Sequence, residues 1–470
     1  MISKQLCSLV LILMLAAGCR TLPVHNKPLK TYSRDYGYRY RNIAPGQNDS
    51  DSLLVVLTFS GGGTRAAALA YGVLCVLRDT PVYWEGQTRR LLDEVDIISS
   101  VSGGSLTAAY YGLFGDRIFE EFPRRVLYRN IQGSLLRSLF VPGNLFKLVS
   151  PFYGRTDLMA DNFGRWIFER KTYGDLLAQN RRPYLIINTT DMTRGSRLGF
   201  TQGQFDLLYS DLSSYPIGNA VAASAAFPGL LAPMTLHNFR KPEDFRPPAW
   251  ATAERSGKTS FVPDDQSCYL DESRPYVHVV DGGVSDNLGL LPVIMGLDGH
   301  YSDDKIGDGT TDSLPKKVII LTVNAEGSSK RTWDLNMGLP GLLDTLLSSG
   351  TAPLGNFSRA QISYLRQQIA YRDTLRGIKH ELDQQAAAQG ASIHIPALDR
   401  PAIDFHFVEV AFSQLRSPEQ RDEMSQIPTN FNLGTKKVND VCAAARDILD
   451  INPEFQAMLT TLRPPDSGQK

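Results

Sequence analysis

One short stretch of this chain passes from an apolar strand to a closely packed helix with almost no space between them. Residues 95–98 read Val-Asp-Ile-Ile and are mostly apolar, as in a buried strand, and residues 99–105 then hold only Ser, Val and Gly. Residues 106–110 read Leu-Thr-Ala-Ala-Tyr and begin a helix whose side chains are mostly small. The turn must therefore be sharp, and the strand and helix backbones nearly touch there.

This turn has the layout of a nucleophile elbow, in which a strained backbone aims a serine hydroxyl outward. Ser102 takes the serine position, and Ser100 and Gly104 stand two residues before and after it, where small residues are needed. Ser100 replaces the first glycine of the usual Gly-x-Ser-x-Gly pattern and is still small. A Ser/Gly-rich loop without chemistry would show the same residues, so this stretch alone leaves both interpretations open.

A glycine-rich turn follows the first apolar strand, residues 53–59. It contains Gly61, Gly62, Gly63 and Arg65 and leads into a helix from residue 66 to about residue 77. Backbone N–H groups and a helix N-terminus favour an anion, either a bound phosphate or the oxyanion of an acyl-transfer transition state. Phosphate binding is the weaker interpretation, because the lysine of a P-loop and the last glycine of a dinucleotide fingerprint are both missing.

A third turn follows the apolar strand at residues 276–280. Asp281 ends this strand, and Gly282 and Gly283 let the chain turn away and leave the carboxylate facing a cleft. An ordinary turn-forming Asp-Gly pair is the simpler interpretation when the segment is considered alone.

Taken in order, the three turns resemble the motifs of the patatin-like phospholipase family. These motifs are a Gly-Gly-Gly-x-Arg/Lys turn, a Gly-x-Ser-x-Gly elbow and an Asp-Gly-Gly/Ala turn. The resemblance covers roughly residues 53–325 and includes residues 223–228, which match the family's Ala-Ser-x-Ala-x-Pro segment. Ser100 and Ala66 stand where the family usually has glycine.

The resemblance implies an α/β/α sandwich around a mainly parallel sheet, and a serine acyl hydrolase that uses no metal or cofactor. Ser102 would be the nucleophile and Asp281 its base, with the N–H groups of Gly61, Gly62 and Gly63 as the oxyanion hole. The substrate would be a phospholipid, a lysophospholipid or another acyl ester. Arg65 would hold the glycine turn, lie near a lipid phosphate, or be a surface charge.

Two alternatives stay open at this stage. A Ser-His-Asp triad would need one of the seven histidines beside Ser102, but none of them has a motif around it. His237 or His406 against Ser102 would overturn the preference for a dyad. The second alternative is a non-catalytic envelope lipoprotein that keeps the fold and binds lipid or protein.

The N-terminus predicts a bacterial lipoprotein. Residues 1–18 have a basic residue, an apolar run and a small-residue cleavage site, and Cys19 follows as the residue to be acylated. The absence of Asp at position 20 indicates an outer-membrane lipoprotein of the cell envelope, anchored to the membrane through Cys19. A plain secretory signal with an incidental cysteine is the alternative. Lys+Arg and Asp+Glu are equal at 49 each, so no basic excess indicates a nucleic-acid partner.

The remaining chain divides by pattern. We expect a tether at residues 19–50, a catalytic domain at 51–330 with an insertion at about 238–275, and a helical C-terminal extension at 331–470 packed on the core. Residues 113–160 alternate apolar and basic side chains, which fits either a membrane-surface element or a helix packed on the core. Cys75, Cys268 and Cys442 allow one disulfide, whose pairing stays open.

Overall fold

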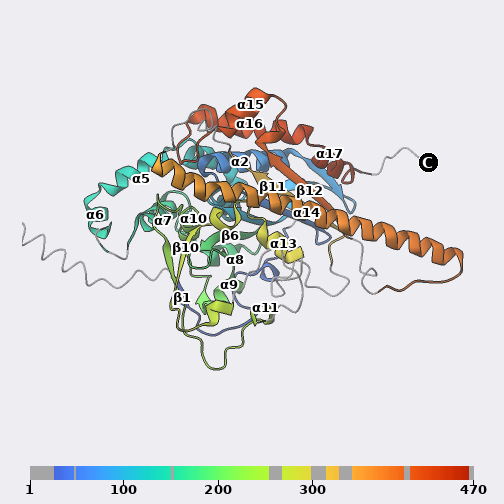
Figure 1. Cartoon of the computed structure of the whole chain (residues 1–470), viewed down its shortest axis with the longest axis horizontal. Helices are drawn as coiled ribbons and strands as arrows, with labels where there is room; N and C mark the ends of the chain where they lie inside the picture. The colour runs from blue at the N-terminus through green and yellow to red at the C-terminus, as the bar shows by residue number, and fades with distance from the viewer. Residues whose placement is uncertain are drawn as a thin grey trace, which may run out of the picture.

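The computed structural model describes residues 26–46, 49–148, 150, 153–252, 267–297, 314–327, 341–395 and 403–464. Its centre is a mixed sheet of eight strands (Figure 1). Along the sheet the strands are β12 (Asp404–Ala411), β11 (Lys317–Asn324), β2 (Leu53–Phe59), β5 (Val95–Val101), β6 (Tyr184–Asp191), β10 (Tyr276–Asp281) and β9 (Met234–His237), with β7 (Arg197–Phe200) paired to β6. The first five strands are parallel and the last three pairings are antiparallel, which confirms the mainly parallel sheet.

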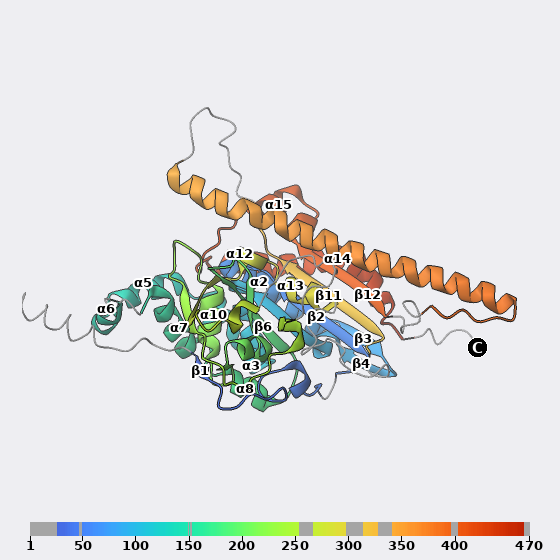
Figure 2. The same cartoon turned by 60° about the horizontal axis from the view of Figure 1, so that its bottom comes forward.

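Helices cover both faces of the sheet, as the views in Figure 1 and Figure 2 show. One layer contains α2 (Gly63–Asp79), α3 (Gly103–Phe114) and α16 (Thr435–Ile451), which pack on one another. The long helix α14 (Leu342–Ala388) lies on the other face, where its Arg366 and Arg372 stack over Phe407 and Phe405 of β12. The predicted three-layer sandwich is therefore confirmed.

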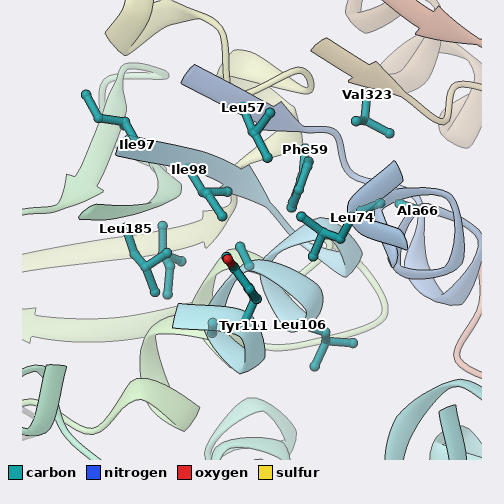
Figure 3. Packing of buried hydrophobic residues seen from close by; sticks show 14 of the residues in the cluster. Leu57, Phe59, Ala66, Leu74, Ile97, Ile98, Leu106, Tyr111, Leu185 and Val323 are labelled. Carbon is teal, nitrogen blue, oxygen red and sulfur yellow. The ribbon is translucent and has the colours of Figure 1, made fainter. Parts of the chain in front are cut away.

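The sheet is buried because its central strands are apolar on both faces, as parallel strands between helices require. Every residue of β2 and β5 is buried. Figure 3 shows Leu57 of β2, Ile98 of β5 and Leu185 of β6 turned toward Leu74 of α2 and Tyr111 of α3. This packing fixes α2 and α3, and with them the two turns that precede these helices.

The other elements surround this core. They are η1 (Tyr40–Asn42), the hairpin β3 (Pro81–Trp84) and β4 (Gln87–Arg90), η2 (Leu91–Glu94), α4 (Arg117–Phe122), the π-helix η3 (Pro123–Leu127), α5 (Ile131–Leu139), α6 (Pro142–Leu148), α7 (Arg155–Trp166), α8 (Tyr173–Gln179), α9 (Gln202–Leu207), α10 (Ile217–Ser224), α11 (Ala249–Thr252), η4 (Ser267–Leu270), α12 (Gly283–Asp286), α13 (Leu291–Leu297), η7 (Phe412–Gln414), α15 (Pro418–Ser425) and α17 (Pro453–Thr460). In the described part of the chain, no helix combines the length and the hydropathy needed to cross a bilayer.

The segment predicted as a tether differs from that expectation over the residues that are described. Asn26, Tyr38 and Arg39 are buried, and Arg39 forms an ion pair of 2.5 Å with Asp206. The short strand β1 (Lys27–Pro28) pairs with β8 (Ser210–Asp211). These are contacts between segments far apart in sequence, so local pattern does not reveal them. The predicted signal peptide and Cys19 lie outside the described residues.

The C-terminal extension belongs to the same core. It supplies helices, as predicted, and also β12, which pairs in parallel with β11 at the edge of the sheet. No disulfide joins any two of Cys75, Cys268 and Cys442.

Candidate active site

Strand register brings the two predicted reactive residues together. Asn188 of β6 pairs with Val101 of β5, and the next residue, Thr189, pairs with Asp281 of β10. Both β6 residues pair with β7 on their other side, so β5 and β10 meet end to end along one edge of β6. Ser102 directly follows Val101, and it therefore emerges where Asp281 ends its strand.

Ser102 has the strained backbone expected of an elbow. Its φ is 50° and its ψ is −119°, a region that non-glycine residues rarely adopt. A Cβ on Gly103 would lie 2.0 Å from the carbonyl oxygen of Gly63, and one on Gly104 would lie 2.7 Å from that of Ser60. The close approach of the two backbones explains why both positions are glycine, as predicted for Gly104.

Hydrogen bonds from neighbouring segments hold the elbow. The Ser102 N–H donates to Ser224 Oγ at 2.8 Å, and the Ser224 hydroxyl donates to the carbonyl of Asn188 at 2.6 Å. Ser100 is fully buried, and its hydroxyl lies 3.4 Å from the carbonyl of Ile186. The sequence identified the segment around Ser224 but gave Ser224 itself no role.

Asp281 is buried, and the strand register places it beside Ser102. The Gly283 N–H donates to Asp281 Oδ1 at 2.7 Å. Burial raises the pKa of Asp281 to about 6, against the lowering effect of the Gly283 N–H and the nearby Ser102 hydroxyl. Gly282 packs so closely that an added Cβ would lie 2.3 Å from the carbonyl oxygen of Asn188. The Asp-Gly-Gly turn thus presents a carboxylate poised to accept a proton near neutral pH.

The glycine turn lies against Ser102 but differs from prediction at its first glycine. A Cβ on Gly61 would lie 3.4 Å from Ser102 Cβ, yet the Gly61 N–H donates to the carbonyl of Asn287 at 2.9 Å. Gly61 is therefore not a free oxyanion donor. Among the residues that the structure describes, the N–H groups of Gly62 and Gly63 meet no acceptor. Their φ angles of 142° and 60° favour glycine.

Asn287 joins two of the turns, and sequence reasoning missed it. Its side-chain oxygen would lie 2.6 Å from a Cβ added to Gly61 and 3.0 Å from one added to Gly283. The amide therefore sits between the glycine turn and the turn that carries Asp281. The only signal in the sequence is a polar residue six positions after Asp281 in a segment that becomes apolar.

Arg65 is an internal anchor for the glycine turn. Its Nε donates to the carbonyl of Ala325 at 2.9 Å, Nη1 donates to the carbonyl of Ile427, and Nη2 to Thr429 Oγ1 at 3.3 Å. Burial lowers its pKa to about 10, so the guanidinium is charged at neutral pH. Of the three predicted roles, the structure favours holding the turn, here against the C-terminal extension.

We expect Arg65→Met to lower the free energy of unfolding by about 3 kcal/mol, because it leaves buried carbonyl groups without donors. Denaturant unfolding measures the change. Arg446→Met is the matched control, since Arg446 forms an exposed ion pair with Asp79 at 2.9 Å and should contribute less than about 1 kcal/mol. Equal effects of the two substitutions would contradict the anchoring role.

The histidines that were weighed for a triad have other contacts. His237 stacks on Phe239 near the β9 edge, and His278 Nδ1 lies 2.9 Å from Thr235 Oγ1. His406 belongs to β12 at the opposite edge of the sheet and lies 3.1 Å from both Lys317 and Asp404. Neither His237 nor His406 lies against Ser102. Within the described ranges, no group of three His, Cys, Asp or Glu side chains could hold a metal ion.

The fold and this site define an α/β/α protein with a strained serine at a strand–helix elbow and a buried carboxylate beside it. A sequence model described as patatin-like phospholipase matches residues 57–294, just over half of the chain. The protein therefore belongs to the patatin-like phospholipase family, a family of lipolytic hydrolases. No curated protein matches the sequence.

Solved structures show distant similarity. Human GIVD cytosolic phospholipase A2 has 13% identity and a TM-score of 0.44, over 88% of this chain and 60% of that chain. Its complex with methyl gamma-linolenyl fluorophosphonate and terbium chloride has 12% identity and a TM-score of 0.41, over 88% and 59%. VipD from Legionella pneumophila has 13% identity and a TM-score of 0.27, over 92% and 73%. This chain thus spans about three fifths of the human phospholipase chain.

Proposed function

We propose that this protein is a serine acyl hydrolase that cleaves carboxylic esters of phospholipids or lysophospholipids with a Ser102–Asp281 dyad. The observation that carries the proposal is the strand register that places Ser102, in its strained elbow, beside a buried carboxylate whose pKa is raised to about 6. A carboxylate with that pKa is largely ionised at pH 7 and is still basic enough to accept a proton from serine in the transition state. The strained elbow supports the proposal because it aims the hydroxyl away from the sheet.

In the first half-reaction, Ser102 Oγ attacks the ester carbonyl carbon while its proton moves to Asp281. The C=O electron pair moves to the carbonyl oxygen, which becomes the oxyanion of a tetrahedral intermediate. When this intermediate collapses, the bond to the alcohol oxygen breaks, and Asp281 returns the proton to that oxygen. The alcohol leaves, and the acyl group stays on Ser102 as an ester.

In the second half-reaction, water replaces the alcohol. Asp281 accepts a proton from the water as its oxygen attacks the acyl carbon, and the second tetrahedral intermediate forms. Its collapse breaks the bond to Ser102 Oγ, which takes the proton from Asp281, and a fatty acid leaves. The net reaction consumes one water and restores both side chains.

The oxyanion needs donors that are free before the substrate arrives. Gly62 and Gly63 meet this requirement, whereas Gly61 donates to Asn287. We add the Gly103 N–H, which begins α3 directly after the nucleophile and meets no acceptor among the described residues. Each such donor contributes about 2.7–4 kcal/mol in other hydrolases, so two or three can support catalysis by a weak base.

We further propose that acylated Cys19 anchors the enzyme in a bacterial envelope membrane, as an outer-membrane lipoprotein. The support is the sequence alone, in which a short apolar run and small residues precede Cys19. An anchored enzyme would meet lipid esters in the membrane that carries it.

A fluorophosphonate tests the proposed function. Ser102 Oγ should form a bond to phosphorus and expel fluoride, and mass spectrometry should place one adduct on the Ser102 peptide. The matched control is the exposed pair in which the Ser273 hydroxyl donates to Asp271 at 2.7 Å, because it places a serine beside an aspartate without the elbow. Labelling of Ser273, or no labelling together with no release of fatty acid from phosphatidylcholine, would contradict the proposal.

A further inference from the structure

A long segment near the site carries only positive charge. Residues 122–156 contain no Asp or Glu and six cations, although the whole chain has equal numbers of acidic and basic residues. The cations are Arg124, Arg125, Arg129, Arg137, Lys147 and Arg155. Helices α5 and α6 lie in this segment and extend from the body at one end of the molecule in both views (Figure 1, Figure 2).

Helix α5 has apolar side chains on two opposite faces. Ile131 is buried and Leu135 packs against the core, which gives the inward face. Leu136 and Phe140 are four residues apart and therefore share the opposite face, where 53% of Leu136 and 82% of Phe140 are exposed. Val141, the next residue, is 49% exposed. Packing among the described residues does not account for the exposure of these three large apolar side chains on a cationic element.

This element begins beside the glycine turn. The Gln132 N–H donates to the carbonyl of Phe431 at 3.3 Å, and the preceding residue, Asn430, accepts a hydrogen bond of 2.8 Å from the Thr64 N–H. Asn430 and Phe431 thus connect the start of α5 to the turn that carries Gly62 and Gly63.

A fourth exposed apolar residue follows the segment that supports Asp281. The Asp281 N–H donates to the carbonyl of Ala226 at 3.0 Å, and Leu230, four residues later, is 65% exposed. The loop then reaches α7, where Thr156 Oγ1 donates to the carbonyl of Ala232 at 2.5 Å. Since α7 also contacts α5, the loop and α5 belong to one region around the site.

We infer that Leu136, Phe140, Val141 and Leu230 form a docking face for the surface of an anionic phospholipid bilayer. Large apolar side chains enter the interface between headgroups and acyl chains, and the surrounding cations are attracted to anionic headgroups. Arg125 pairs with Glu121 and Glu169, and Lys147 pairs with Asp161, all outside the segment. The other four cations form no ion pair with a carboxylate among the described residues, so the segment keeps a positive charge that is complementary to such a surface. The inference rests on the proposed function, because docking here would bring Ser102 close to membrane esters. Within residues 113–160 it applies the membrane-surface interpretation only to the exposed face of α5 and Val141, because Ile118, Phe122 and Val126 are buried in the core.

Tryptophan quenching tests the docking face without catalysis. Full-length Ser102→Ala protein with Phe140→Trp is mixed with vesicles of phosphatidylcholine and phosphatidylglycerol that carry brominated acyl chains. We expect added quenching that grows with the phosphatidylglycerol fraction. Tyr371→Trp is the matched control, because Tyr371 is an exposed aromatic residue on α14, and it should show no added quenching. Equal quenching at the two positions would overturn the inference.

A kinetic test uses the active protein. Phe140→Asp should lower the ratio of vesicle phospholipid turnover to soluble short-chain ester turnover by about tenfold, since it removes one buried aromatic contact with the bilayer. Tyr371→Asp should leave this ratio unchanged. An unchanged ratio in Phe140→Asp would contradict docking. Docking would also be contradicted if the wild type forms a dimer that Phe140→Asp separates and the Phe140→Trp protein shows no quenching by the vesicles. If the wild type hydrolyses neither substrate but Phe140→Trp is still quenched, the proposed function fails and the docking face stands.

Discussion

Ser102→Ala should lower turnover of a short-chain acyl ester by about 10⁶-fold, the loss found when the nucleophile of another serine hydrolase is removed. The physical reason is that the strained elbow presents the Ser102 hydroxyl beside the Asp281 carboxylate, which lies at the end of the neighbouring strand. Without Ser102 Oγ, the acyl-enzyme cannot form, and Asp281 can only activate water directly. Steady-state rates on a chromogenic ester and on phosphatidylcholine measure the loss.

Ser273→Ala is the control for this loss. Ser273 donates to the exposed Asp271, and its removal should leave both rates unchanged. Turnover by Ser102→Ala within tenfold of the wild type would remove Ser102 from the mechanism. If that residual turnover separates from the protein during purification, it comes from a contaminant. The alternative of a binding protein with this fold would then gain support.

Asp281→Asn should lower turnover by about 10⁴-fold, which corresponds to about 5.4 kcal/mol in the activation free energy. Asparagine keeps the shape of the side chain but cannot accept the proton of Ser102. Binding of substrate should change little, so the loss should appear in kcat rather than in KM. A loss smaller than tenfold would show that another group takes the proton.

The exposed pair Ser273–Asp271 is also the comparison for the pKa of the carboxylate. Hydrogen bonds from Ser273 and Arg274 lower the pKa of Asp271, whereas burial raises the pKa of Asp281 to about 6. Both pairs place a serine beside an aspartate, but only the buried carboxylate is basic enough to assist catalysis near neutral pH. Asp271→Asn should therefore leave the rates unchanged.

Local sequence was sufficient to single out Ser102 and Asp281, which the fold brings together. Ser102 and Asp281 were predicted from the turns in which they lie, because each turn places special demands on its neighbours. Gly104 and Gly282 are glycine because an added Cβ would come within 2.7 Å and 2.3 Å of backbone oxygens. Steric demands of this kind act within a few residues, and they leave a pattern that can be read without a structure.

The parts that could not be predicted depend on long-range contacts. The Gly61 N–H is taken by Asn287, and Arg65 reaches Ile427, which is 362 residues away along the chain. Tyr38 is buried although its segment has no periodic pattern. The sheet order is of the same kind, since β11 and β12 become neighbours of β2 only through the fold. Nothing in a local window specifies such partners.

The pH dependence of kcat/KM for a soluble ester tests the central claim most directly, because it reports the base in the free enzyme. Asp281 must be ionised to act, so the rate should be constant above its pKa of about 6 and fall about tenfold for each pH unit below it. A carboxyl group ionises with little heat, so this midpoint should barely change between two temperatures. A midpoint near 4, or one that falls on warming as that of a histidine would, would contradict the dyad.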